Sequence, residues 1–276
     1  MLRQITGCRD LEARRDQLLK AGAVVNGLPS PLELEREARR GSLWAESFSE
    51  GLLILRKRRG FSRLSFMLAK GAELPPWTPE GCVAVETPFR PQDQELQRID
   101  RALEERGFRL VLSRVRLTRR PGGPLPPWGR GEVLRAGPGL LERAEELLEA
   151  GFSPLTGCLP QREELLEDLE QGRIFMSPWG ILHFSERGNV TEVRHLTVAA
   201  ERRGMGQAKG LLAAYLSEYG GKTARVWTGG DNAPALGLYH SFGYQEDPWR
   251  SHVRVWGQYG EFGKEDGVCG NNYCSC

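Results

Sequence analysis

Hydrophobic and polar positions follow the same order twice along the chain. In the first half, two patterns with helical spacing each stop at a glycine, and runs with strand spacing come after them. The predicted elements of this half are helices at 11–22 and 31–41, strands at 43–48, 51–58, 61–69 and 82–89, a helix at 94–108 and a strand at 108–120.

The second half repeats this order in a fuller form. Its predicted elements are helices at 140–150 and 162–172, strands at 173–179, 180–186 and 190–198, a helix at 208–221, a strand at 223–229, a short helix at 233–244 and a strand at 251–256. Tight turns between most of these strands favour antiparallel neighbours. We therefore predict an α/β fold, with a mixed, largely antiparallel sheet flanked by helices.

Proline and glycine separate the two halves. Residues 119–131, RRPGGPLPPWGRG, contain four prolines and four glycines, which disfavour both helix and central strand. The predicted domains are residues 1–120 and 132–256, joined by a linker at 121–131. Residues 257–276 are polar and rich in glycine, and we predict a flexible tail that contains cysteines.

Composition excludes several classes of protein. A net charge of +2 over 276 residues gives no electrostatic footprint for nucleic acid or for a membrane surface. The N-terminal residues have no apolar core like that of a signal peptide, and no apolar stretch has the length that a bilayer requires. The cysteine usage predicts a reduced, cytoplasmic chain. We expect no metal site, because Cys269, Cys274 and Cys276 lack the two close pairs typical of zinc.

The stretch ERRGMGQAKG, residues 201–210, lies where a strand gives way to a helix. The first amide groups of a helix have no partner inside it, and the helix dipole adds positive charge there. Gly204 and Gly206 allow the backbone to approach a ligand, and Arg202 and Arg203 add cations. This combination is typical of a pyrophosphate site, although a plain tight turn is the alternative.

Two motifs then carry a resemblance to a known family. LTVAAERRGMGQAKGLLAAYL resembles motif A of the GNAT acyltransferase superfamily, whose loop pattern Q/R-x-x-G-x-G/A is met by Arg203, Gly206 and Ala208. NAPALGLYHSFGY resembles the second motif of the same superfamily. The resemblance covers about residues 132–256. The order of elements in the first half resembles that of the same fold without motif A, so this half is similar to a degenerate copy of it.

The resemblance implies acetyl-CoA as co-substrate. Amides of residues 203–208 would bind its pyrophosphate, and the strand end at 196–198 would pair with the pantetheine arm. The Val198 amide would also face the thioester carbonyl, and Tyr239 would protonate the departing thiolate. The residues expected to contact the coenzyme are Leu196, Thr197, Val198, Arg203, Gly204, Met205, Gly206, Gln207, Ala208 and Asn232.

Three groups could serve as the general base. Glu192 lies six residues before Val198, a position from which some members of the superfamily supply a base. By the period of two, Glu192 would share a strand face with Leu196 and Val198. His195 would lie on the opposite face and is the second candidate; an ordered water is the third. His183, His240 and His252 are predicted to be surface or packing residues.

The predicted function is acetyl transfer from acetyl-CoA to an amine by direct attack in a ternary complex. The acceptor would be a small-molecule or peptide amine selected by residues 151–161 and 246–256. Two alternatives stay open: a coenzyme A-binding module with little catalysis, and an aminoacyl-tRNA-dependent transferase of similar fold. The second needs no pyrophosphate loop, and the balanced charge predicts no nucleic-acid partner and no membrane partner.

Overall fold

The computed structural model describes residues 2–127 and 132–259. Contacts divide them into two compact units. Unit 1 contains residues 2–113 and 249–259, and unit 2 contains residues 114–127 and 132–248. Each unit has a sheet with helices on both faces, so the predicted fold class is confirmed.

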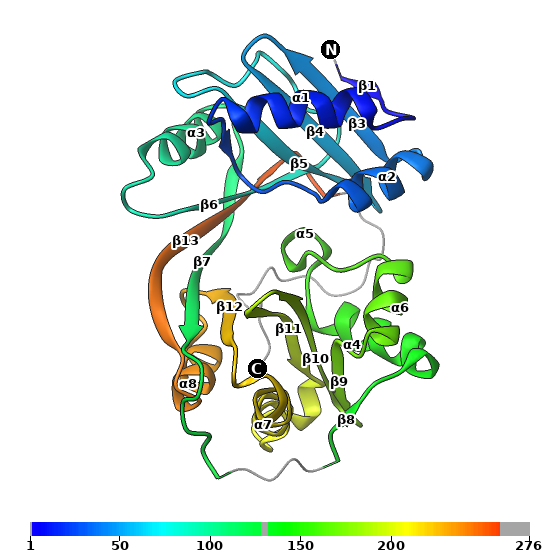
Figure 1. Cartoon of the computed structure of the whole chain (residues 1–276), viewed down its shortest axis with the longest axis vertical. Helices are drawn as coiled ribbons and strands as arrows, with labels where there is room; N and C mark the ends of the chain where they lie inside the picture. The colour runs from blue at the N-terminus through cyan, green and yellow to red at the C-terminus, as the bar shows by residue number, and fades with distance from the viewer. Residues whose placement is uncertain (1, 128–131, 260–276) are drawn as a thin grey trace. The chain divides into compact units, whose positions relative to one another are not determined.

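Unit 1 is built on a largely antiparallel sheet (Figure 1). Its elements are β1 (Arg3–Gln4), α1 (Arg9–Lys20), β2 (Val24–Val25), α2 (Pro31–Arg39), β3 (Leu43–Phe48), β4 (Gly51–Arg58), β5 (Phe61–Leu68), β6 (Val83–Phe89), α3 (Gln94–Glu105) and parts of β7 (Arg109–Arg119) and β13 (Gln245–Trp256). Local sequence sets the start of α2, where the Ser30 hydroxyl accepts from the Glu33 amide and the Glu33 carboxylate accepts from the Ser30 amide.

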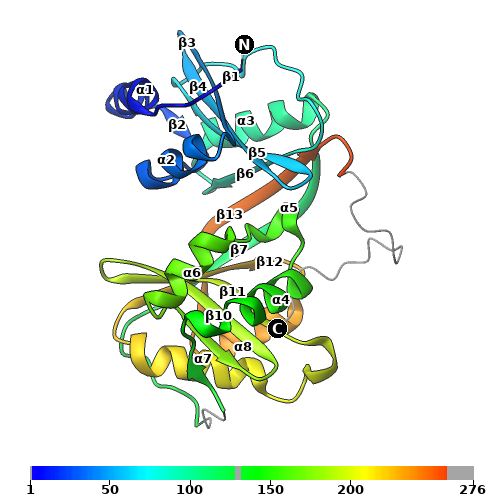
Figure 2. The same ribbon diagram turned by 90° about the vertical axis from the view of Figure 1, so that its right-hand side faces the viewer.

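The sheet of unit 1 is buried on both faces. Helices α1 and α2 cover one face and α3 covers the other, as Figure 2 shows. In β4, Leu52 and Ile54 belong to the core beneath α1 and α2, whereas Leu53 and Leu55 belong to the core beneath α3. A strand that is buried on both faces has an unbroken apolar run, and this explains the sequence GLLIL at its start.

Unit 2 repeats this arrangement with an additional long helix. Its elements are β8 (Leu134–Arg135), α4 (Leu141–Gly151), α5 (Pro154–Gly157), α6 (Arg162–Glu170), β9 (Ile174–Ser177), β10 (Gly180–Arg187), β11 (Val190–Val198), α7 (Gln207–Tyr219), β12 (Thr223–Gly229) and α8 (Ala233–Ser241), with the remaining parts of β7 and β13. Helices α7 and α8 pack on one core, and α4 and α6 pack on the other.

The two units exchange strands. Strand β7 follows α3 of unit 1, but its residues Arg114–Arg119 pair with β12 of unit 2. Strand β13 follows α8 of unit 2, but its residues Arg250–Trp256 pair with β6 of unit 1. Each unit therefore completes its sheet with a strand from the other half of the chain.

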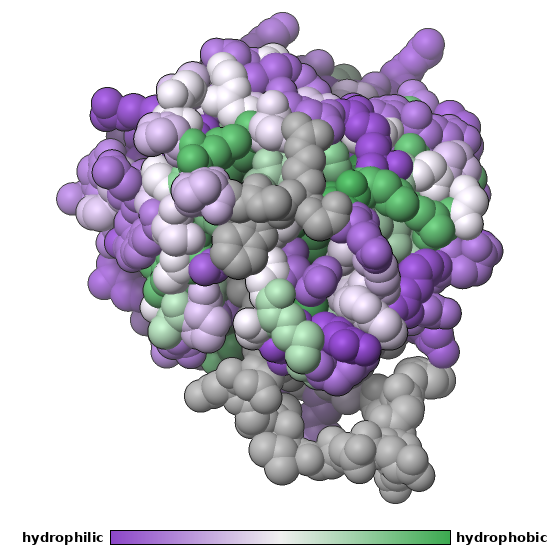
Figure 3. Space-filling view, turned by 90° about the horizontal axis from the view of Figure 1, so that it is seen from below, coloured by the Kyte–Doolittle hydropathy of each residue, from purple (hydrophilic) through white to green (hydrophobic). Residues whose placement is uncertain are grey.

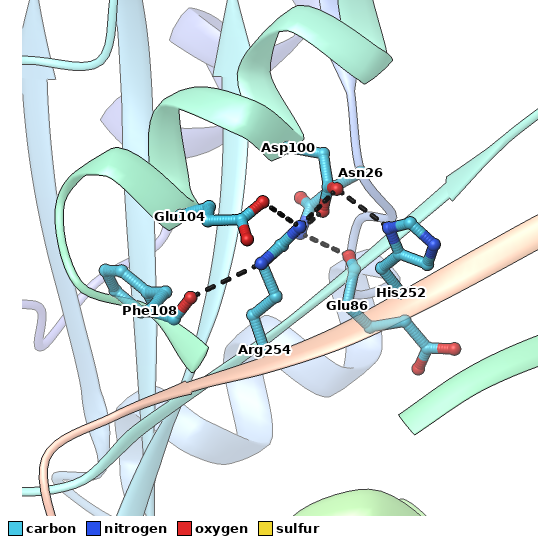
Figure 4. A network of polar contacts seen from close by, with 7 residues as sticks. All are labelled: Asn26, Glu86, Asp100, Glu104, Phe108, His252 and Arg254. Atoms are coloured by element: carbon cyan, nitrogen blue, oxygen red, sulfur yellow. Dashed lines mark hydrogen bonds and ion pairs between the residues drawn. The ribbon is translucent and has the colours of Figure 1, made fainter. Parts of the chain in front are cut away.

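A polar network fixes the exchanged strand β13 to α3 (Figure 4). Arg254, 4% exposed, donates from Nε and Nη2 to the two carboxylate oxygens of Asp100 at 2.9 and 3.0 Å. Nη2 also lies 2.9 Å from Glu104, and Nδ1 of His252 lies 2.8 Å from Asp100 Oδ2. Burial raises the pKa of Asp100, but the hydrogen bonds from His252 and Arg254 outweigh it and leave that pKa lowered. Asp100 is therefore held as a carboxylate beside a buried guanidinium.

The boundaries of the two units differ from the predicted domain boundaries because of this exchange of strands. The sequence assigns residues 114–120 to the first domain, whereas the contacts place them in unit 2. Strand β13 begins at Gln245, six residues before its predicted start, because the strand continues through Pro248. The predicted tail with Cys269, Cys274 and Cys276 lies outside the described residues.

Exposed hydrophobic side chains are scattered. Leu32, Leu134 and Met205 are 54%, 50% and 63% exposed and lie far apart in the chain. On the face seen in Figure 3, hydrophobic residues gather in small groups between hydrophilic ones. Within residues 2–127 and 132–259, no helix combines the length and the hydropathy that a membrane crossing requires.

Candidate active site

Two glycines shape the loop between β11 and α7. Strand β11 ends at Val198, and Gly204 and Gly206 have φ of 76° and 79°. Side chains disfavour this left-handed backbone, so glycine suits both positions. Gly206 caps α7 without a side-chain hydrogen bond. Glycine has no side chain that could accept from the first amides of α7, so the cap residue itself does not occupy the groups that a ligand would bind.

A cavity of about 560 Å³ lies at this loop. Its lining comprises residues Arg202–Lys209, Val198 of β11 and four residues of α8. Seven of the ten predicted coenzyme contacts line it: Val198, Arg203, Gly204, Met205, Gly206, Gln207 and Ala208. The N-terminus of a helix and the cations of the loop suit a phosphate group. These residues fit the pyrophosphate of a coenzyme.

Strand β11 leaves its neighbour β12 close to the cavity. The two strands pair in parallel from Val190 to Val193 only, while β10 pairs with β11 as far as Val198. In the described part of the chain, Leu196–Val198 thus have a paired strand on one edge. Their other edge offers backbone groups to an extended ligand such as a pantetheine arm.

A β-bulge at Arg194 explains why one prediction is wrong. His183 pairs with His195, but Phe184 pairs with Val193, so Arg194 is an extra residue in β11. Val193 packs in the same core as Leu196 and Val198, because the extra residue shifts the alternation of faces by one. Glu192 therefore does not share a face with Leu196 and Val198. It lies on the face of His195 instead.

Tyr239 lies on α8 and Asn232 caps that helix, but neither residue lines the cavity. Tyr239 is 3% exposed, and its ring packs edge-on against Tyr244 with centroids 5.4 Å apart. Asn232 caps α8, since its Oδ1 accepts from the Ala235 amide at 3.1 Å. Leu238, next to Tyr239 in the sequence, does line the cavity. The proposed roles of Tyr239 and Asn232 stay predictions.

Of the two positions predicted for His183, surface or packing, the structure shows the second, and the ring also belongs to a buried polar network. His183 and His195 are 0% and 2% exposed, and their Nδ1 atoms lie 3.1 Å apart. Nε2 of His183 lies 2.8 Å from Asp168 Oδ2 on α6, and Nε2 of His195 lies 2.7 Å from the Gly157 carbonyl on α5. Arg173 donates to the other oxygen of Asp168 at 2.9 Å. We call Asp168, His183 and His195 the histidine relay.

Burial acts on every member of the histidine relay. Desolvation lowers the pKa of His183 and lowers the pKa of His195 well below its usual value. Burial raises the pKa of Asp168, but hydrogen bonds from His183 and Arg173 outweigh this effect and leave it lowered. Without the bulge, the hairpin register would place His183 opposite Arg194. The sequence alone carried no signal for that shift of one residue.

Unit 1 has a similar strand opening, but its own chain fills it. Strands β5 and β6 pair in parallel only from Ser62 to Leu64 on β5. Beyond that point Asn26, 6% exposed, accepts from the Phe66 amide at 2.7 Å and donates to the Glu86 carbonyl at 2.9 Å. Strand β2 then pairs with Met67 and Leu68. A side-chain amide and a short strand occupy the edge that is open in unit 2.

Comparison with known proteins supports this description. Residues 169–244 match the model of the Acetyltransferase (GNAT) family, and this segment contains the glycine loop and the whole of α8. The match to the family model therefore lies within the C-terminal half of the chain. No curated protein matches the chain.

Solved structures extend the likeness of fold beyond the GNAT domain. A GCN5-related N-acetyltransferase from Sphaerobacter thermophilus is 18% identical with a TM-score of 0.55, covering 93% of this chain and 95% of its own. A GNAT-family acetyltransferase from Colwellia psychrerythraea is 14% identical with a TM-score of 0.55, over 92% and 98% of the two chains. A tandem GNAT protein from the clavulanic acid biosynthesis pathway, without AcCoA, is 13% identical with a TM-score of 0.56, over 96% and 100%. The GNAT-like fold therefore covers both units.

Proposed function

We propose that the protein is an N-acetyltransferase that moves an acetyl group from acetyl-CoA to an amine acceptor within one ternary complex. The family match of residues 169–244 supports acyl transfer in general. The observation that carries the proposal is the glycine loop with its cavity beside the free edge of β11. A ligand with an anionic phosphate and an extended arm suits both features together.

The coenzyme site is assigned to the loop and the strand end. Amides of residues 203–208 would bind the pyrophosphate, and Leu196–Val198 would hydrogen-bond to the pantetheine arm. Asn232 would bind the coenzyme from the start of α8. Bound acetyl-CoA supplies the activated acetyl group. The Val198 amide would stabilise negative charge on the thioester oxygen, an effect that reaches about 3–4 kcal/mol per donor in enzymes.

Proton transfer needs one base and one acid. An amine acceptor that binds as an ammonium must lose a proton before it attacks, and the candidates for the base are Glu192, His195 and an ordered water. We assign Tyr239 as the acid that protonates the departing thiolate. Its hydroxyl need act only when charge develops on sulfur, so it should contribute to turnover more than to coenzyme affinity.

Unit 1 is proposed to act as a degenerate copy that binds no coenzyme. Asn26 and β2 occupy its strand opening, and the described residues between β5 and β6 form no helix with a glycine loop. A ligand at this edge would have to displace buried hydrogen bonds of the chain itself, which is costly.

Thiol release decides between an enzyme and a binding module. Purified protein is incubated with acetyl-CoA and a panel of small amines and short peptides, and free thiol is followed with a colorimetric reagent. We expect thiol release that depends on one class of amine. A coenzyme-dependent rise in melting temperature without thiol release for any amine would instead identify a coenzyme A-binding module.

A further inference from the structure

The two faces of the sheet in unit 2 differ in composition. On the face of α7 and α8, one apolar core extends from β10 through β11 and β12 to β7. On the face of α4 and α6, the apolar core includes Ile174, Met176 and Ile181 of β9 and β10, but no described residue of β11, β12 or β7. Side chains of these three strands on the α4 face are therefore not needed for an apolar core and are available for recognition.

Charged and aromatic side chains lie on this face of β12 and its neighbours. Val226 belongs to the core beneath α7, so by alternation Arg225 and Trp227 lie on the opposite face. The register sets Arg225 beside Glu192 of β11. It also sets Trp227 beside Arg116 of β7. We call Glu192, Arg225, Trp227 and Arg116 the polar face of unit 2.

Arg225 differs from the other arginines of this side of the sheet. Arg116 donates from Nε to Asp247 Oδ2 at 2.7 Å. Arg114, two residues before Arg116 on the same face, donates to the Thr156 carbonyl. Nε of Arg225, in contrast, is buried and has no hydrogen-bond partner in the described part of the chain. A buried donor without an acceptor is costly, so this guanidinium gains from an acceptor that a ligand brings.

The polar face adjoins the place where the coenzyme arm would end. Strands β11 and β12 pair as far as Val193 and Val226, so an arm that enters from the glycine loop can extend between them only to that pair. Val198 lies five residues after Val193, and one of these is the bulge residue, so the opening is about 13 Å long at about 3.3 Å per residue. Arg225 directly precedes Val226 and therefore lies at the closed end of the opening.

An acceptor can reach this opening from one face of the sheet. The apolar core beneath α7 and α8 includes Val193, Leu196 and Val198 of β11 and Ala224 and Val226 of β12, and it closes the other face. The acceptor amine must therefore approach the thioester from the polar face. Any second group on the acceptor then lies among the side chains of that face.

The charges on this side of the sheet favour an anionic second group. Three arginines stand near two carboxylates: Arg114, Arg116 and Arg225 with Glu192 and Asp247. One positive charge is therefore in excess. A guanidinium presents its N–H groups as a planar fork that matches the two oxygens of a carboxylate.

We propose, resting on the acetyl transfer proposed above, that the acceptor is an amine that also carries a carboxylate, and that Arg225 binds this carboxylate. The carbon chain of the acceptor lies along the half-buried ring of Trp227. Its amine lies at the opening between β11 and β12. Arg225 is thus a binding residue that selects the acceptor and takes no part in proton transfer.

Matched acids and amides test this proposal on the native full chain. The pairs are 4-aminobutanoate with 4-aminobutanamide and 6-aminohexanoate with 6-aminohexanamide, which differ within a pair only in the charge of the second group. Thiol release from acetyl-CoA gives kcat/KM for each compound. We expect the acid of at least one pair to exceed its amide by roughly tenfold to a hundredfold, because hydrogen bonds to a charged group are the stronger ones. Amides as good as their acids in both pairs would overturn the proposal.

Arg225→Gln removes the charge and the fork without removing a hydrogen bond of Nε. We expect the melting temperature to stay near that of the native protein and the ratio of acid to amide to fall close to one. Arg187→Gln, which removes an exposed arginine at the end of β10, is the matched control and should keep the native ratio. A native ratio in Arg225→Gln would overturn the proposal.

Titration calorimetry provides a readout besides turnover. Each of the two acids is titrated into the full chain saturated with coenzyme A, which has no acetyl group to transfer. We expect one of them to bind, and to bind at least about tenfold more weakly to Arg225→Gln. Equal binding to both proteins, or binding of neither acid, would overturn the proposal.

The two proposals fail in different ways. Thiol release without a preference for acids would overturn the role of Arg225 and leave the proposed function intact. Binding of an acid that depends on Arg225, without thiol release from any amine, would show that the proposed function fails while the carboxylate site is present.

Discussion

Asp100→Asn is expected to destabilise unit 1 strongly. Asp100 accepts from Arg254 Nε at 2.9 Å, from Arg254 Nη2 at 3.0 Å and from His252 Nδ1 at 2.8 Å. An asparagine has one acceptor oxygen, so its NH₂ group must face at least one of these donors. A lost charge-assisted hydrogen bond costs about 1.5–3 kcal/mol, and a buried charge without its partner costs about 3–5 kcal/mol in total.

Urea unfolding followed by tryptophan fluorescence measures this loss. With a free-energy decrease of about 3 kcal/mol and an m-value of about 2 kcal/mol/M, the midpoint should fall by about 1.5 M. Glu104→Gln is the matched control. It removes a contact to the same guanidinium, but the Glu104 side chain is 62% exposed, so its loss should cost less than about 1 kcal/mol. A midpoint for Asp100→Asn within the range of this control would refute the reasoning.

The pH dependence gives an independent check of the same carboxylate. The pKa of Asp100 is lowered in the folded protein, so its stabilising effect is present above the unfolded value of about 3.9 and is lost as the pH falls through the folded value. The difference in stability between the native protein and Asp100→Asn should therefore be constant near neutral pH and shrink in acid below about pH 4. A difference that stays constant down to acid unfolding would show that the carboxylate charge is not its source.

Three further predictions concern the coenzyme and its chemistry. Gly206→Val should abolish the rise in melting temperature that coenzyme A causes, because φ of 79° is strained for a β-branched residue and the loop amides would move; an unchanged rise would contradict the phosphate-loop assignment. Titration calorimetry on the full chain should give one coenzyme A per chain, whereas two would contradict the role assigned to Asn26. Tyr239→Phe should lower kcat roughly tenfold to a thousandfold with little change in coenzyme affinity, measured by thiol release; normal turnover would show that another group protonates the thiolate.

The element order and the glycine loop could be predicted because both are local. A helix pattern, a strand pattern or a glycine at a turn depends on neighbours within a few residues, and strand β11 was predicted with its observed bounds of Val190–Val198. The same holds for the cavity lining between Arg203 and Ala208, which follows from one strand-to-helix turn. Their roles in coenzyme binding stay predictions.

The histidine relay could not be predicted, because it depends on register. The turn between β10 and β11 sets Arg187 opposite Val190, and simple alternation from there would put His183 opposite Arg194. The extra residue in the bulge brings His195 to that place, and no local pattern marks it. The short α5 was also missed, since its four residues are fewer than a helical pattern requires.

The exchange of strands could not be predicted from the sequence for a related reason. Pairing between β6 and β13 joins residues 83–89 to residues 250–256, and no residue pattern in either segment indicates that the other is its partner.

The exchange of strands also determines which form of the protein is needed to measure coenzyme stoichiometry. A chain beginning at about residue 130 would lack Arg114–Arg119 and leave β12 with an unpaired edge, so the full chain is required.

The same exchange of strands determines when the sheet of unit 1 can be completed during translation. About 160 residues must be translated between the end of β6 and the segment of β13 that pairs with it. At about 5–20 residues per second, β6 waits roughly 8–30 s with one edge unpaired. The first unit to leave the ribosome is thus the last to complete its sheet, and during that interval the unpaired edge of β6 is open to pairing with another chain.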